Sequence, residues 1–211
     1  MLSFLKQYAR NEWYSQNGEE GILAECVKRL ELEFGHAVEI GAHNGFYCSN
    51  TAALVDGAPP FQNQKWTGLM VEADYNLYLE CKRGWSKYEG MRVQCSRVDS
   101  NNINAFVDET CDVLSLDTDG HDYGIFKGLK ARPKIVIVEI DSSIEPPSER
   151  VNADGGVGYW TMTMLALEKG YAVLAHSGNL IVVRQDYTHL FPECSPHPLK
   201  QWELYFNRSW L

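Results

Sequence analysis

Residues 36–45 of the chain read His-Ala-Val-Glu-Ile-Gly-Ala-His-Asn-Gly, and this stretch decides the fold. Its apolar part, which ends at Ile40, predicts a short buried strand. Gly41 and Gly45 predict a tight turn, because glycine adopts backbone conformations that other residues avoid. The residues that follow, 46–55, predict a helix. A strand, a glycine turn and a helix in this order are typical of a site where free backbone N–H groups face a ligand.

Strands and helices alternate along the rest of the chain. An amphipathic helix is predicted at 19–32, where apolar residues recur at steps of three and four. Further strands are predicted at 66–72, 91–98, 112–116 and 134–140, and further helices at 75–82, 103–108, 123–129 and 161–169. Two apolar runs at 171–175 and 180–184 predict an antiparallel hairpin. The sequence therefore predicts a Rossmann-like α/β fold: a mostly parallel sheet flanked by helices, with a C-terminal antiparallel hairpin.

The length of the chain suits one domain. With 211 residues, 45% of them hydrophobic, the chain can bury one sizeable core. We expect a helical N-terminal segment at 1–34, a Rossmann-like core at 35–186 and a tail at 187–211. The tail is expected to pack on the core through Trp202, Tyr205 and Trp210.

The composition disfavours nucleic acid as a partner and a membrane as a location. Lys and Arg number 19 against 28 Asp and Glu, a net charge of −9, which disfavours binding to nucleic acid. No apolar run approaches the roughly 18 to 20 residues that span a bilayer, and the first residues do not resemble a signal peptide. A cytoplasmic protein is therefore expected.

The six cysteines form no C-x-x-C pair, so we expect reduced thiols and no zinc site.

The predicted carboxyl ends of the strands are acidic. In an open parallel sheet, ligands bind beyond these ends. Glu72 ends the second strand, where a carboxylate could accept hydrogen bonds from the vicinal hydroxyls of a ribose. A solvated acid is the alternative, but the glycine turn before it favours a nucleoside site. Asp99 could accept from an adenine amine, although a role as helix N-cap explains it equally well.

The fourth and fifth strands end in a cluster of acids. Residues 117–123 read Asp-Thr-Asp-Gly-His-Asp-Tyr, and residues 138–141 read Val-Glu-Ile-Asp. Clustered carboxylates repel one another and lose solvation, so their presence favours a bound cation, a metal or a proton-transfer role.

The order of these motifs resembles that of the FkbM-like family of class I S-adenosylmethionine-dependent methyltransferases. The resemblance spans about residues 14–186. The motifs that carry it are Ser15-Gln-Asn-Gly-Glu-Glu-Gly21, Glu39-Ile-Gly-Ala-His-Asn-Gly45, Ser49-Asn-Thr51, Gly68-Leu-Met-Val-Glu-Ala-Asp74, Leu116-Asp-Thr-Asp-Gly-His-Asp-Tyr123, Arg132-Pro-Lys-Ile-Val-Ile-Val-Glu139 and Lys169-Gly-Tyr171.

The resemblance implies that a methyl group passes from S-adenosylmethionine to a nucleophile, commonly a hydroxyl oxygen of a small molecule or sugar. It implies that the glycine turn lies beside the methionine part of the cofactor and that Glu72 lies on the ribose. Acid-rich strand ends without a P-loop lysine also suit a sulfonium better than a triphosphate. The residues expected to bind the cofactor are Gln16, Glu39, Gly41, Ala42, His43, Asn44, Gly45, Asn50, Glu72 and Asp99.

Asp117 and His121 are the candidate catalytic residues. A histidine beside acids could remove the proton of the nucleophile, although a histidine in a polar loop is more often structural or solvated. Asp117, Glu139 and Asp141 could instead hold Mg²⁺, which would acidify a substrate hydroxyl. Three acids at strand ends are, however, also ordinary at a cofactor site. The form common in the resembled family after the fourth strand is closer to Asp-x-Glu-Gly, whereas this chain has Asp-Thr-Asp-Gly at 117–120.

Two other functions are open from the sequence. An NAD-dependent oxidoreductase would share the fold, but the G-x-G-x-x-G pattern is absent. A non-catalytic module could bind the cofactor and serve as an interaction platform. The sequence leaves the methyl acceptor open among sugars, polyketides, lipids and small phenols, and it leaves open whether the chain forms a homo-oligomer.

Overall fold

The computed structural model describes residues 4–10 and 13–194. Its strands are β1 (Phe34–Ile40), β2 (Lys65–Glu72), β3 (Met91–Cys95), β4 (Val113–Leu116), β5 (Ile135–Glu139), β6 (Tyr171–His176) and β7 (Asn179–Arg184). Its helices are α1 (Phe4–Tyr8), α2 (Glu19–Arg29), α3 (Ala52–Asp56), α4 (Tyr75–Trp85), α5 (Asp122–Gly128) and α6 (Tyr159–Glu168), with short 3-10 helices η1 (Ile103–Ala105) and η2 (Gln185–Leu190).

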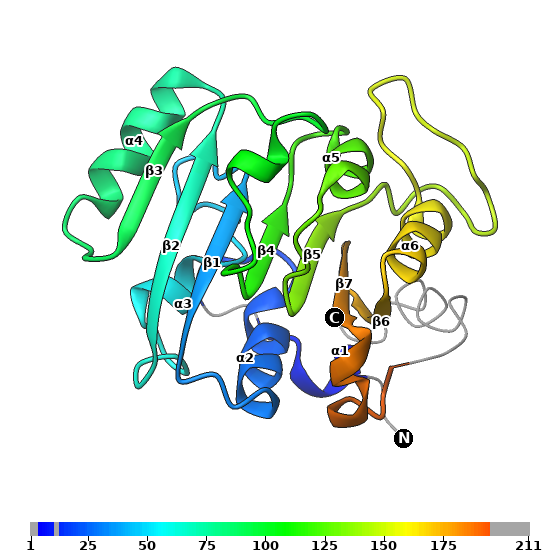
Figure 1. The fold of residues 1–211 in the computed structure, drawn as a ribbon, viewed down its shortest axis with the longest axis horizontal. Helices are drawn as coiled ribbons and strands as arrows, with labels where there is room; N and C mark the ends of the chain where they lie inside the picture. Colours follow the sequence, from blue (N-terminus) through cyan, green and yellow to red (C-terminus); the bar gives the residue numbers. More distant parts are fainter. Residues whose placement is uncertain (1–3, 11–12, 195–211) are drawn as a thin grey trace.

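The strands join in one sheet with the order β3-β2-β1-β4-β5-β7-β6 (Figure 1). Neighbouring strands from β3 to β5 are parallel, whereas β7 runs antiparallel to both β5 and β6. The predicted fold, a mostly parallel sheet with a C-terminal antiparallel hairpin, is thereby confirmed. Every residue of β4 is buried, as expected of a central strand covered on both faces.

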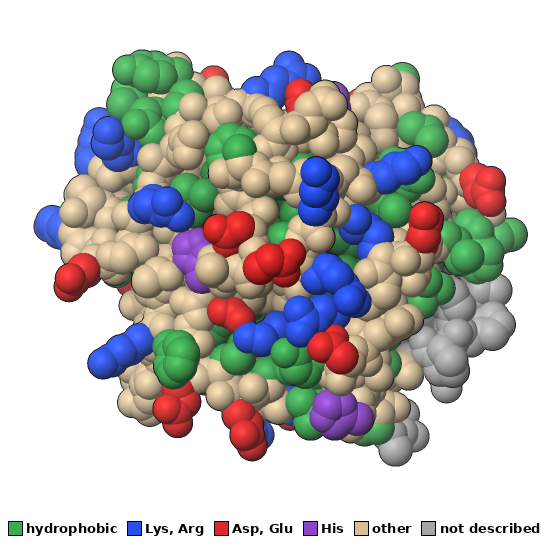
Figure 2. Space-filling view, viewed as in Figure 1, with side chains coloured by type: hydrophobic (Ala, Val, Ile, Leu, Met, Phe, Trp, Pro, Cys, Tyr) green, Lys and Arg blue, Asp and Glu red, His purple; other side chains and the backbone are tan. Residues whose placement is uncertain are grey.

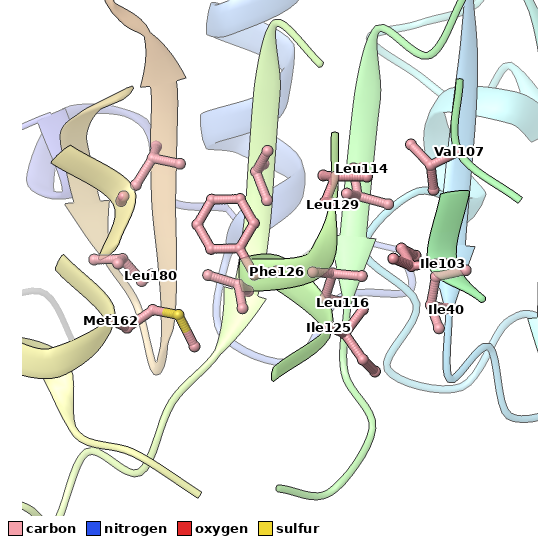
Figure 3. Packing of buried hydrophobic residues seen from close by; sticks show 14 of the residues in the cluster. Ile40, Ile103, Val107, Leu114, Leu116, Ile125, Phe126, Leu129, Met162 and Leu180 are labelled. Atoms are coloured by element: carbon pink, nitrogen blue, oxygen red, sulfur yellow. The ribbon is translucent and has the colours of Figure 1, made fainter. Parts of the chain in front are cut away.

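Helices cover both faces of the sheet. One face packs against η1, α5 and α6, through side chains such as Ile103, Phe126 and Met162 (Figure 3). The other face packs against α1, α2 and α3, and α4 covers the same side near β2 through Cys81 and Trp85. Because alternate residues of each strand point to opposite faces, both layers bury apolar side chains. The candidate site lies beyond the carboxyl ends of the parallel strands β4 and β5.

The predicted helix at 46–55 was mostly wrong, because α3 begins only at Ala52. Cys48 has a backbone φ of +55°, which a right-handed helix does not accommodate. The N–H groups of Asn50 and Thr51 donate to the carboxylate of Glu39 rather than to a preceding helical turn. A tertiary contact therefore overrides the local helical pattern.

The two ends of the described chain carry further short helices. One of them, α1, lies in the N-terminal segment, which was expected to be helical. The expected irregular tail begins with the 3-10 helix η2, and its later part lies outside the described residues, together with Trp202, Tyr205 and Trp210. Across the described ranges, we find no helix with the length and apolarity needed to span a membrane.

Candidate functional site

The glycine turn follows β1 directly and packs on the end of β2. The N–H groups of Gly41 and Ala42 both donate to the carbonyl oxygen of Val71, at 2.9 and 3.1 Å. Gly41, His43 and Gly45 have backbone φ angles of +82°, +50° and +86°. A Cβ atom on Gly41 would lie 1.6 Å from the backbone oxygen of Asp117. Glycine is therefore required here, because the chain passes directly against the end of β4.

Glu72 closes the other side of this turn. Its Oε2 accepts from the N–H of His43 at 2.8 Å, and its Oε1 accepts from the N–H of Asp74 at 2.7 Å. The residue is only 9% exposed. Each carboxylate oxygen has two lone pairs, so each can still accept one hydrogen bond from a ligand. The predicted pairing of Glu72 with the glycine turn is thus present in the geometry.

Glu39 has a different environment from Glu72. Its carboxylate accepts from the hydroxyls of Ser49 and Thr51, at 2.6 and 2.5 Å, and from the N–H groups of Asn50 and Thr51, at 2.9 and 3.3 Å. Burial raises the pKa of Glu39. The side chain of Asn50 donates to Ser115 Oγ on β4 at 3.0 Å, and both residues are buried. Glu39 therefore binds the segment that contains Asn50, and Asn50 in turn binds β4. Together they position the residues after the glycine turn.

A cavity of about 510 Å³ lies beyond the carboxyl ends of β4 and β5. Residues from four segments surround it: the stretch before α2, the β4–α5 loop, the segment between β5 and α6, and the β6–β7 turn. Its lining residues include Gln16, Asn17, Asp117, Asp119, Gly120, Asp122, Tyr123, Glu139, Ile140, Asp141, Ser142, Ser143, Asn152, Asp154, Gly156, Val157, Met162, Gly178 and Asn179. Of the predicted cofactor residues, Gln16 is among the lining residues, whereas Gly41 and Glu72 are not. The cavity and the glycine turn are adjacent because Gly41 contacts Asp117.

Three acids of the cavity influence one another's protonation. Desolvation and the nearby charge of Asp122 raise the pKa of Asp117 to about 6. Desolvation and the charges of Asp117 and Asp122 raise the pKa of Glu139 to about 9, and its side chain hydrogen bonds to Asp117. Glu139 is therefore protonated near neutral pH and can donate to Asp117. Asp122 is buried and accepts from Thr118 and Gly120, so it holds the β4–α5 loop.

Asp119, Asp117 and Glu139 form the candidate metal group among the described residues. One ligand atom from each lies within 4.8 Å of the others. Asp141, which was predicted for this group in place of Asp119, accepts from Ser143 and from Asn152 instead. Oxygen ligands of this kind suit Mg²⁺, but neither the family nor the fold supports a metal.

His121 and Asp99 lie apart from the cavity lining. The exposed ring of His121 has its Nε2 3.1 Å from Nη2 of Arg97. Because a guanidinium only donates, Nε2 of His121 is the acceptor in this contact. Asp99 accepts from the N–H groups of Asn101 and Asn102 in the turn before η1, whose N-cap residue is Asn102 rather than Asp99.

Glu19 is a buried residue of the site to which the sequence analysis assigned no role. Its Oε2 accepts from the N–H of Asn17 at 2.8 Å. Its Oε1 accepts from Ser177 Oγ at 2.8 Å and from Asn179 Nδ2 at 3.1 Å. Glu19 therefore joins two walls of the cavity, the segment before α2 and the β6–β7 turn. The only sequence feature that pointed to Glu19 was its position in the motif at 15–21. Its partners Ser177 and Asn179 lie about 160 residues away in sequence, so the local pattern could not show this role.

Comparisons with known proteins found one family model and several similar folds. A family model described as the methyltransferase FkbM domain matches residues 80–171 and confirms the predicted resemblance. No curated protein sequence matches the chain. The fold is similar to a putative caffeoyl-CoA O-methyltransferase from Staphylococcus aureus, with a TM-score of 0.51 and 14% identity over 76% of this chain and 79% of that one.

A second similar fold is the CMeT domain of the citrinin polyketide synthase. Here the TM-score is 0.53 and the identity 15%, over 79% of this chain but only 51% of that one. At these identities the solved structures show the fold alone. The family-model match over residues 80–171 and the fold both support an S-adenosylmethionine-dependent methyltransferase.

Proposed function

We propose that the chain transfers the methyl group of S-adenosylmethionine to a hydroxyl oxygen of a small molecule or sugar held in the acidic cavity. The observation that carries this proposal is the contact between the two halves of the site. The Gly41 turn, where the cofactor is expected, touches the backbone of Asp117, where the cavity begins. A nucleophile in the cavity would therefore lie next to the cofactor, which is the arrangement that direct displacement requires.

The residues around the glycine turn fit this cofactor. Glu72 retains acceptor capacity for two ribose hydroxyls, and the turn presents backbone rather than side chains at Gly41 and Gly45. Acidic side chains nearby favour a cationic sulfonium. We assign cofactor contacts to Gln16, to the turn at 41–45 and to Glu72, and we assign Glu39 and Asn50 to positioning of the turn.

The acids of the cavity can accept the proton of the acceptor hydroxyl. When bound, S-adenosylmethionine supplies an electrophilic methyl carbon, whose bond to sulfur breaks as the bond to the acceptor oxygen forms. Asp117 is our assignment for the proton acceptor, because its pKa of about 6 is near the pH at which general bases work best. Glu139 donates to Asp117 and keeps its carboxylate oriented. His121 does not line the cavity, and we therefore assign the proton to Asp117 in preference to His121.

Calorimetric titration with S-adenosylhomocysteine tests the cofactor part of this proposal. We expect binding of S-adenosylhomocysteine and not of NAD or ATP. Glu72→Ala should weaken the binding by at least about tenfold, because two charge-assisted hydrogen bonds are lost. Glu72→Gln, which keeps one acceptor oxygen, should fall between wild type and Glu72→Ala.

Glu89→Gln serves as the matched control, since Glu89 is an exposed acid in the turn before β3. It should bind S-adenosylhomocysteine as the wild type does. Stabilisation by NAD without stabilisation by S-adenosylhomocysteine would contradict the proposal and favour an oxidoreductase. A chain that binds S-adenosylhomocysteine but methylates no hydroxylated compound would favour the non-catalytic alternative.

A further inference from the structure

The cavity has a single sign of charge. Six of its lining side chains are acidic, namely Asp117, Asp119, Asp122, Glu139, Asp141 and Asp154, and its lining residues include no Lys, Arg or His. On the face of the molecule drawn in Figure 2, by contrast, basic side chains lie among the acidic ones. The acidic lining is therefore a property of the cavity rather than of the whole surface. A phosphate or carboxylate in this cavity would meet repulsion without a compensating cation.

The remaining lining is mostly polar and uncharged. Amide and hydroxyl side chains come from Gln16, Asn17, Ser142, Ser143, Asn152 and Asn179. Ligand pockets in proteins are usually lined mainly by apolar and aromatic side chains, and few lining residues here are of that kind. Amides and hydroxyls both donate and accept, which matches the hydroxyl groups of a polyol. The volume, about 510 Å³, is sufficient for a small sugar.

One acceptor atom in the lining lacks a donor. Oδ1 of Asn152 is buried and has no hydrogen-bond partner among the described residues, while Nδ2 of the same side chain donates to Asp141. A buried acceptor without a donor is unfavourable, so such atoms usually have a partner in the functional state. Hydroxyl and ammonium groups can donate to this oxygen, whereas carboxylate and phosphate groups cannot.

Two exposed acids lie at the rim of the cavity on neighbouring loops. Asp119 belongs to the β4–α5 loop, and Asp154 belongs to the long segment between β5 and α6, drawn in yellow-green in Figure 1. The loops approach closely at glycines: a Cβ on Gly120 would lie 2.7 Å from the backbone oxygen of Asp154. Asp119 and Asp154 thus stand on two loops that meet at the cavity, where a single cationic group could reach both.

We propose that the methyl acceptor is a small polyol that carries an ammonium group, an amino sugar or aminocyclitol by chemical class, whose ammonium lies between Asp119 and Asp154. This inference rests on the proposed function, because it takes the cavity to be the acceptor site. The hydroxyls of the acceptor pair with the amide and hydroxyl lining, and one hydroxyl lies towards Asp117. Anionic sugars are excluded by repulsion.

Ligand-observed NMR on the full chain, saturated with S-adenosylhomocysteine and kept in EDTA, tests the inference. The probes are glucosamine, galactosamine and 2-deoxystreptamine, each compared with a neutral counterpart, glucose, galactose or inositol, and with glucuronate. We expect at least one amine to bind about tenfold more tightly than its neutral counterpart, in line with two partly exposed ion pairs. Glucuronate should not compete with it.

The double variant Asp119→Asn, Asp154→Asn removes both charges and keeps side-chain shape. It should weaken binding of the amine about tenfold and leave binding of the neutral sugar unchanged, while Glu89→Gln should change neither. Asp154→Asn keeps a side-chain oxygen that can accept from the N–H of Gly156, so the loop should stay folded. Circular dichroism and the affinity for S-adenosylhomocysteine check the fold of the double variant.

Three results would overturn the inference: glucuronate binding as tightly as the amines, no amine preferred to its neutral counterpart, or an amine preference that survives in the double variant. Failure of the proposed function has a separate signature, the absence of binding of S-adenosylhomocysteine. Mass spectrometry of products formed from S-adenosylmethionine then locates the methyl group. Methylation on nitrogen would contradict the assignment of oxygen while it supports the class of acceptor.

Discussion

A comparison of Gly41→Ala with Gly57→Ala isolates the contact on which the site depends. Both glycines have positive φ, +82° and +71°, so alanine loses about 1 kcal/mol of conformational free energy at either position. They differ in their surroundings. A Cβ at Gly57 meets nothing within 4 Å, whereas a Cβ at Gly41 would lie 1.6 Å from the backbone oxygen of Asp117. Backbone must move at Gly41, and overpacking of this kind adds roughly 3 kcal/mol.

The expected magnitudes are easily separated. In a chain of this size, 1 kcal/mol shifts Tm by about 2–4 °C. Gly57→Ala should therefore lower Tm by about 2–4 °C, and Gly41→Ala by about 8–16 °C. Urea unfolding followed by tryptophan fluorescence measures the same difference, since Trp66 and Trp85 are buried in the core. Gly41→Ala should also weaken binding of S-adenosylhomocysteine, because β1 and β4 separate at the site.

Equal destabilisation by the two substitutions would refute this reasoning. It would mean that the glycine turn moves away from Asp117 without loss of stability, and that this contact does not hold the glycine turn and the cavity together. A Gly41→Ala variant with reduced stability but unchanged affinity for S-adenosylhomocysteine would refute only the second part, the transmission of the displacement to the site.

Three further predictions concern single acids and one histidine. Glu39→Ala should lower the free energy of unfolding by about 3 kcal/mol in urea titrations, because buried donors lose a charged acceptor, and Glu39→Gln should lower it less. The pKa of Glu139 in the folded protein, about 9, lies above its ordinary value of 4.5. Its contribution to stability is therefore full below about pH 4.5 and is lost as the pH rises through 9. Between pH 6 and pH 8.5 in EDTA, the free energy of unfolding should decline less for Glu139→Gln than for the wild type. His121→Ala should leave the affinity for S-adenosylhomocysteine and the turnover rate within about twofold, whereas a catalytic base would lose at least about a hundredfold in rate.

Local patterns predicted most of the sheet because buried parallel strands are continuous apolar runs. The predicted strand at 134–140 and the observed β5 differ by one residue at each end, and α5 begins one residue before the predicted helix. The hairpin followed from two apolar runs around a short turn. These elements form because their own apolar side chains are buried, and the pattern of apolar residues that predicts this burial can be read from the sequence.

The failures share a different cause, which is contact between residues distant in sequence. The helix predicted at 46–55 starts late because Glu39 binds the N–H groups of Asn50 and Thr51. In the same way, the sequence indicated which acids lie at the cavity but not which of them lie close to one another. Asp119 rather than Asp141 lies with Asp117 and Glu139, because Asn152 and Ser143 engage Asp141. The partners of Asp141 come from a segment without periodic pattern.

The acids of the site also differ in their hydrogen-bond partners, and this difference distinguishes acids with a structural role from acids that can react. Glu39 and Glu19 are buried and accept from several donors each, and those donors come from loops that the two residues hold in place. Asp117 and Glu139 instead face each other across the cavity wall with raised pKa values and share a proton. The oxygens of Glu39 and Glu19 are occupied by donors from these loops, and neither residue lines the cavity, whereas Asp117 and Glu139 both do. Reactivity in this site should therefore be confined to the ends of β4 and β5, while the acid at the end of β1 keeps the turn before α3 in register with them.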